Sequence, residues 1–96
     1  MNKAEAQEIL ATELLQFRTK SYEDLQRQIG SPHVVERGGA SGVLYTIEIE
    51  VLWDNPRDLG GYLRVIASID DGGFLSALSP LSSDFIIDAD GNFIGE

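Results

Sequence analysis

The sequence predicts an α+β domain in which two N-terminal helices pack on an antiparallel meander sheet of four to five strands. Three observations support this prediction. Apolar residues recur at helical spacing in the first third of the chain, and after Pro32 they alternate with polar residues as in strands. Short glycine-rich segments join the alternating stretches, which favours antiparallel pairing of consecutive strands. The 96 residues form one domain, residues 1–96, and the arrangement is analogous to cystatin-like folds.

A long helix is predicted over residues 3–19, a stretch that contains neither Gly nor Pro. Its apolar residues share one stripe: Ala6, Ile9, Leu10, Leu14 and Phe17. Four charged residues are expected off the centre of this stripe: Glu5, Glu8, Glu13 and Lys20. Ser21 is the predicted N-cap of a second, shorter helix that ends at Gly30. The buried face of this second helix is expected to hold Tyr22, Leu25 and Ile29.

The clearest strand is residues 43–53, which has one apolar and one polar face. Residues 62–70 alternate in the same way, and a short strand is expected at 33–37. The inward positions of the two longer strands are almost all apolar: Tyr45, Ile47, Ile49, Val51, Trp53, Leu63, Val65, Ala67 and Ile69. Glu48 and Glu50 fall on the outward, solvated face, where we expect Arg64 on the next strand to offset their repulsion.

The last third of the chain carries two turn signals. Residues 70–73 are predicted to form a tight turn that leads into a strand at 74–78. Residues 88–92 place Asp-Gly between two apolar segments, which is typical of a β-hairpin. Residues 82–84 offer an alternative, because their side chains are also suited to cap a helical turn that runs through Ile87. The sequence leaves both interpretations open.

Composition excludes several classes of protein. Sixteen acidic residues against seven basic ones give a formal net charge of −9 and a pI near 4.3. Proteins that bind nucleic-acid backbones or anionic membranes are expected to be basic, so no nucleic acid and no membrane is an expected partner. No apolar run is long enough to span a bilayer, and the polar N-terminal segment does not resemble a signal peptide. We therefore expect a cytoplasmic protein, and the absence of Cys excludes disulfides and thiolate chemistry.

Few side chains are candidates for catalysis, and the sequence predicts no enzyme, no cofactor and no metal site. His33 is the only imidazole, and neither a nucleophile elbow nor a phosphate-binding loop is present. The acids at 88–92 do not fit the spacing of a calcium loop, so we interpret them, like those at 70–73, as turn formers. The alternative is a small-ligand-binding or enzymatic domain with a pocket between helix and sheet, which the apolar inward positions disfavour.

Charge is unevenly distributed, because no Lys or Arg follows Arg64. The predicted function is a non-catalytic, acidic protein-binding module, in its most concrete form inhibitor-like or immunity-like, with a basic protein as partner. The candidate binding face consists of the acids in the two predicted turns: Asp70, Asp71, Asp88 and Asp90. A homodimer formed through an edge strand at 33–37 or 74–78 is the alternative.

Four segments of the chain carry a resemblance to other proteins: residues 21–25, 45–54, 69–73 and 85–96. Together they resemble a group of small, uncharacterised bacterial proteins of about this length. The resemblance covers most of the chain and implies a stand-alone bacterial domain. It implies no catalytic or binding residue.

Overall fold

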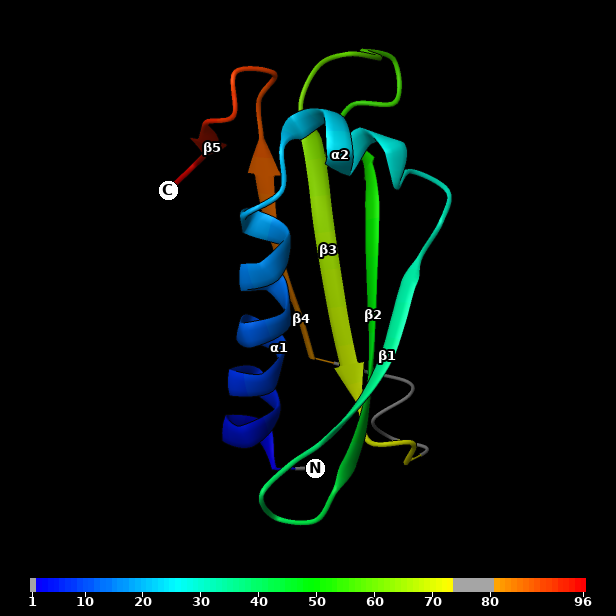
Figure 1. Cartoon of the computed structure of the whole chain (residues 1–96), viewed down its shortest axis with the longest axis vertical. Coiled ribbons are helices and arrows are strands. Elements are labelled where there is room, and N and C mark those ends of the chain that lie inside the picture. The colour runs from blue at the N-terminus through cyan, green and yellow to red at the C-terminus, as the bar shows by residue number, and fades with distance from the viewer. Residues whose placement is uncertain (1, 74–80) are drawn as a thin grey trace.

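The computed structural model describes residues 2–73 and 81–96, and these residues form two layers. A five-stranded antiparallel sheet with the strand order β1-β2-β3-β4-β5 carries a long helix on one face (Figure 1). The elements are, in chain order, α1 (Lys3–Arg18), α2 (Tyr22–Arg27), β1 (His33–Gly38), β2 (Leu44–Trp53), β3 (Leu63–Asp70), β4 (Leu81–Ile87) and β5 (Phe93–Ile94). The predicted α+β class and the antiparallel meander are thus confirmed.

Local signals set the bounds of the helices. Asn2 caps α1, since its side chain accepts a hydrogen bond of 3.1 Å from the backbone N–H of Glu5. Ser21 caps α2 in the predicted manner by accepting a hydrogen bond of 3.1 Å from the N–H of Asp24. Helix α2 ends at Arg27, earlier than the predicted end at Gly30, and residues 28–30 form a turn. Gly30 has a φ of 83°, a backbone conformation that other residues rarely adopt.

The sheet owes its single buried face to the period-two pattern of β2 and β3. Their inward side chains oppose each other across the ladder, as in the pairs Ile47 with Ile69 and Val51 with Val65. Helix α1 packs mainly on β3 and β4, and α2 packs on β2 and β3. The buried core is shared by helices and sheet: Ala6, Leu10, Leu14, Phe17, Tyr22, Leu25, Tyr45, Ile47, Ile49, Val51, Leu63, Val65, Ala67, Ile69, Phe85 and Ile87. Each large aliphatic side chain in it contributes about 1.5–3 kcal/mol through burial.

The C-terminal segment forms the hairpin, and the helical alternative for residues 82–87 is wrong. Those residues belong to β4, in which Phe85 pairs with Val65 and so adds its ring to the core. A turn closed by the 2.9 Å hydrogen bond from Asp88 N to Asn92 O returns the chain to β5. The predicted strand at 74–78 lies outside the described residues.

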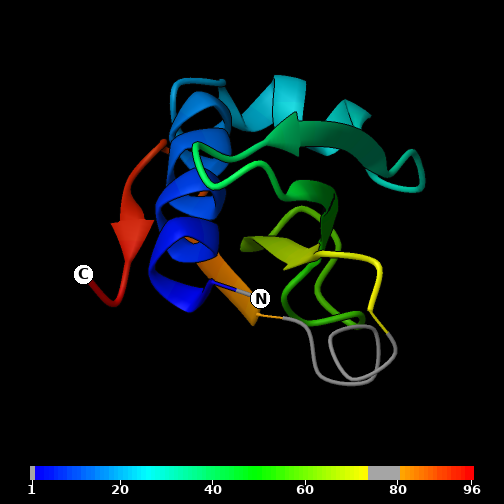
Figure 2. The same cartoon turned by 90° about the horizontal axis from the view of Figure 1, so that it is seen from below.

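The sheet curves around α1, so that the turn between β1 and β2 lies beside the first turn of that helix (Figure 2). At the other end, Arg18 holds the C-terminal strand. Its guanidinium lies 4.8 Å from the ring centre of Phe85 and 4.9 Å from that of Phe93, and it forms a 2.7 Å ion pair with Glu96. Among the described residues, neither helix has the length and apolar content that crossing a membrane requires.

Candidate functional site

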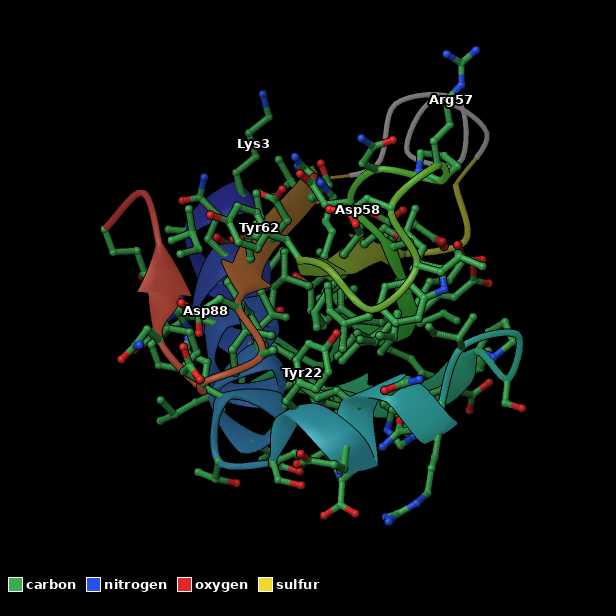
Figure 3. The ribbon with its side chains drawn as sticks, turned by 90° about the horizontal axis from the view of Figure 1, so that it is seen from above. Lys3, Tyr22, Arg57, Asp58, Tyr62 and Asp88 are labelled. Atoms are coloured by element: carbon green, nitrogen blue, oxygen red, sulfur yellow. The ribbon has the colours of Figure 1, made fainter. Side chains whose placement is uncertain are left out.

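The four predicted binding-face acids lie at two opposite ends of the sheet. Asp70 ends β3 and Asp71 follows it, whereas Asp88 and Asp90 follow β4, which runs antiparallel to β3. The two pairs are therefore separated by the length of the strands, roughly 25 Å. Figure 1 shows the two ends at the bottom and top of the molecule, and Figure 3 looks onto the end that carries Asp88. The structure does not bring the four acids together.

The side chains of these acids accept hydrogen bonds from backbone N–H groups within their own turns. This agrees with the prediction that they are turn formers. Asp70 Oδ1 accepts a hydrogen bond of 2.9 Å from the N–H of Gly72. Asp88 Oδ1 accepts two, from the N–H groups of Asp90 at 3.0 Å and Asn92 at 2.9 Å. Such bonds stabilise tight turns, so turn formation accounts for much of the acid in this part of the chain.

Strand register instead assembles a cluster of carboxylates on the face of the sheet opposite α1. Thr46 on β2 pairs with Glu36 on β1 and with Asp70 on β3. Glu48 lies two residues further along the same face of β2, so both acids are its diagonal neighbours at about 7–8 Å. Glu50 continues the row, and all but the half-buried Asp70 are exposed. We call Glu36, Glu48, Glu50 and Asp70 the acidic quartet.

Arg64 does not offset the repulsion within the quartet, and this expectation was wrong. Arg64 pairs with Leu52 in the ladder, and its guanidinium binds two other carboxylates. Nε donates to Asp54 Oδ1 at 2.9 Å, and a second nitrogen forms an ion pair with Asp84. The hydrogen bond to Asp54 is the main reason why the pKa of Arg64 is raised above its usual value. On the outer face of the described strands, Arg64 is the cation nearest in register to the quartet, and it is held by acids outside the quartet.

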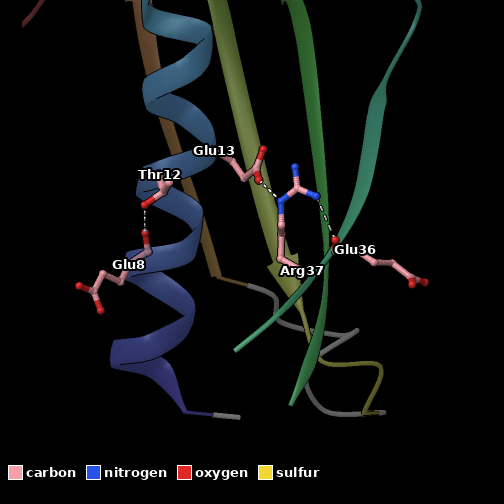
Figure 4. Close-up of polar contacts among 5 residues, drawn as sticks. All are labelled: Glu8, Thr12, Glu13, Glu36 and Arg37. Atoms are coloured by element: carbon pink, nitrogen blue, oxygen red, sulfur yellow. Dashed lines mark hydrogen bonds and ion pairs between the residues drawn. The ribbon is translucent and has the colours of Figure 1, made fainter. Parts of the chain in front are cut away.

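A second feature is a groove between α1 and the C-terminal end of β1, with a volume of about 410 Å³. We call it the α1–β1 groove. It is lined by Glu5, Glu8, Ile9, Thr12, Glu13, Gln16, Arg37, Gly38, Gly39 and Ala40. Figure 4 shows Glu13 on α1 directed toward Arg37 on β1, whose Nε donates to Glu13 Oε1.

Glu13 contradicts the expectation that it lies off the centre of the helix stripe, because only 2% of it is exposed. Its Oε2 is buried and has no hydrogen-bond partner among the described residues. The signal was present in the sequence, since Glu13 follows Ile9 by four residues and precedes Phe17 by four, which places it on their face of a helix.

Glu5 joins the first turn of α1 to the turn after β1 at the other end of the groove. Its carboxylate accepts hydrogen bonds from Ser41 N at 3.0 Å, Ser41 Oγ at 2.5 Å and Tyr45 OH at 3.0 Å. The Ser41 hydroxyl is the largest cause of a lowered pKa for Glu5. A Cβ at position 39 would overlap the Glu5 carboxylate, so Gly39 permits the close approach of this turn to the helix.

The single imidazole takes part in packing. The ring of His33 meets that of Phe17 edge to face, with centroids 5.4 Å apart. Among residues 2–73 and 81–96, no group of three or more His, Asp or Glu side chains is arranged to hold a metal ion.

Comparison with known proteins returns no match: no family model, no curated protein and no solved structure is similar to this chain. The resemblance to small bacterial proteins and the analogy to cystatin-like folds therefore stay predictions.

Proposed function

We propose that the protein is a non-catalytic binding module that docks a basic protein through the acidic quartet. The observation that carries this proposal is the register of β1, β2 and β3, which places the other three acids of the quartet within about 8 Å of Glu48 on an open sheet face. Carboxylates this close repel one another. A basic partner bound to them would offset that repulsion and would itself be attracted to the quartet.

The surroundings of the quartet suit a protein surface. Val34, whose ladder partner is Glu48, is 57% exposed, and Ile66, the ladder partner of Glu50, is half-buried. These two side chains offer a partner apolar contacts next to the charges of the quartet. The quartet supplies long-range attraction, which raises the association rate and makes the complex sensitive to salt.

A non-catalytic role agrees with the small number of nucleophilic and imidazole side chains in the chain. The chain has no Cys and one His, and His33 packs against Phe17. The proposal assigns the protein an inhibitor-like or immunity-like role in the bacterial cytoplasm, where basic toxins, nucleases and regulators are the partners of matching charge.

The test is a pull-down with two variants of equal charge change. Glu48→Lys with Glu50→Lys reverses the centre of the quartet, and Glu23→Lys with Asp90→Lys reverses two exposed acids on α2 and in the last turn. Captured proteins are identified by mass spectrometry, and binding is measured again with the purified partner at low and high salt. We expect a basic partner that binds the wild type and the control pair, is released by salt, and is lost from the quartet variant.

Two outcomes contradict the proposal. One is a partner that the quartet variant and the control variant bind equally well, and the other is a protein that captures nothing at low salt. Size-exclusion chromatography with light scattering accompanies the test, and we expect a monomer. A dimer would instead support pairing through the free edge of β1.

A further inference from the structure

Glu13, on the helix side of the sheet, has a buried carboxylate oxygen that no donor among the described residues contacts. Its side chain is 3% exposed, its Oε1 accepts from Arg37 Nε, and its Oε2 has no partner among the described residues. Buried polar atoms in folded proteins nearly always have a partner, so an orphaned carboxylate oxygen calls for a specific explanation.

The α1–β1 groove gives that oxygen a setting in which a ligand fits. Its volume of about 410 Å³ lies within the range of about 300–1,000 Å³ that is typical of small-molecule sites. Three carboxylates line it against the single cation of Arg37. Glu5 is already bonded to Ser41 and Tyr45, which leaves the exposed Glu8 and the buried Glu13 to attract a positive ligand, and their side chains leave α1 on different sides (Figure 4).

Arg37 leaves part of the Glu13 carboxylate unsatisfied. Its Nε donates to Oε1 alone, its Nη1 donates to the backbone oxygen of Glu36 at 3.2 Å, and its side chain is 47% exposed. Because the bond from Arg37 occupies Oε1 alone, a ligand cation can bind Oε2 beside Arg37 while that bond stays in place.

We propose that the α1–β1 groove binds a primary ammonium group carried on an aliphatic stem. An ammonium offers three donors and no acceptor, which matches the orphaned Oε2, and the negative charge of Glu8 in the groove lining adds attraction. Ile9 and the methylene groups of Gln16 provide an apolar wall for the stem. A lysine side chain of a partner and a free aliphatic diamine share this chemistry, and the site is independent of the acidic quartet.

The test uses two probes, cadaverine as a free diamine and the peptide acetyl-Gly-Lys-Gly-amide as a lysine side chain, in calorimetric titrations followed by amide NMR. Saturable binding is expected with shifts at residues 8–16 and 37–40. Binding of cadaverine alone identifies a small-molecule site, and binding of the peptide as well identifies a site for a lysine side chain. Tetramethylammonium, which has the charge but no N–H donor, is the ligand control and should not bind.

Three variants locate the site. Glu13→Gln should weaken binding at least about tenfold, because it removes a charged acceptor. Glu8→Gln, at an exposed position, should weaken it about twofold to threefold and keeps the test valid if the Glu13 variant does not fold. Glu48→Gln on the opposite face should leave binding unchanged.

The proposal is overturned by three results. These are the absence of saturable binding for both probes, equal affinity in the wild type and a folded Glu13→Gln variant, or shifts centred on the outer face of the sheet. Because the Glu48→Gln control touches only the quartet, failure of the groove and failure of the proposed partner surface give different results.

Discussion

Replacing Arg37 with Ala should destabilise the fold far more than replacing its partner, Glu13, with Met. The reason is the unequal burial of the two side chains: Glu13 is 3% exposed, and Arg37 is 47% exposed. Without Arg37, the buried carboxyl group has no donor on either oxygen among the described residues. Without Glu13, the guanidinium of Arg37 turns into water.

The structure sets the magnitudes. Removing one partner of a buried ion pair costs about 3–5 kcal/mol, and the partial exposure of Arg37 places Arg37→Ala at the lower end, about 3 kcal/mol. Replacing the buried carboxylate with an apolar side chain of similar size is neutral or stabilising, and for Glu13→Met we expect a gain of about 1 kcal/mol. Each kcal/mol shifts the melting temperature of a domain of this size by about 4–8 °C.

Urea denaturation measures both variants, with the single Trp53 as the fluorescence probe and circular dichroism as a second signal. Arg27→Ala is the matched control, because the side chains of Arg27 and Asp24 are 73% and 54% exposed and their ion pair should contribute less than about 1 kcal/mol. The reasoning is refuted if Arg37→Ala costs no more than Arg27→Ala, or if Glu13→Met destabilises as much as Arg37→Ala.

Two further predictions concern the ends of the molecule. Arg18→Ala should cost about 1–2 kcal/mol and speed amide exchange in β5, because its guanidinium lies over Phe85 and Phe93, and unchanged protection of β5 would contradict this role. Ser41→Ala should raise the pKa of Glu5 toward its usual range, because it removes the hydroxyl donor. A carboxyl group whose pKa is lowered by folding stabilises the fold at pH values above its unfolded pKa, and this stabilisation is lost as the pH falls through its folded pKa. The variant should therefore be less stable than the wild type at neutral pH, and the difference should shrink on acidification. Carbon-detected NMR of the carboxyl group measures the shift, and identical titration of Glu5 in both proteins would refute the contact.

Local pattern was sufficient to predict the first three strands of the sheet. The alternation over residues 43–53 fixed which side of β2 is buried, and the short segments joining the strands fixed antiparallel order. Residues 82–87 could not be decided locally, since Ser and Asp suit both a helix cap and a strand. The pairing of Phe85 with Val65, a contact distant in sequence, determines the outcome.

The candidate site depended on register and was predicted only in part. Glu48 and Glu50 were expected on the solvated face from their spacing, but Glu36 joins them only through the pairing of β1 with β2. The acids of the two turns were grouped because no Lys or Arg follows Arg64, and the sequence left open whether the two turns lie close together. An antiparallel connection carries the chain to the opposite end of the sheet, so Asp70 and Asp88 cannot meet.

The central claim is that the outer face of the sheet is the docking surface for a basic protein. Its most direct test is a titration of the isotope-labelled protein with hexa-arginine, a basic probe without primary ammonium side chains, followed by amide NMR at low salt. We expect the largest shifts at the outward positions of β1, β2 and β3 around Glu48, and their loss in the variant with Lys at positions 48 and 50. Shifts centred on residues 88–92 or in the α1–β1 groove, or equal shifts over the whole surface, would contradict the claim.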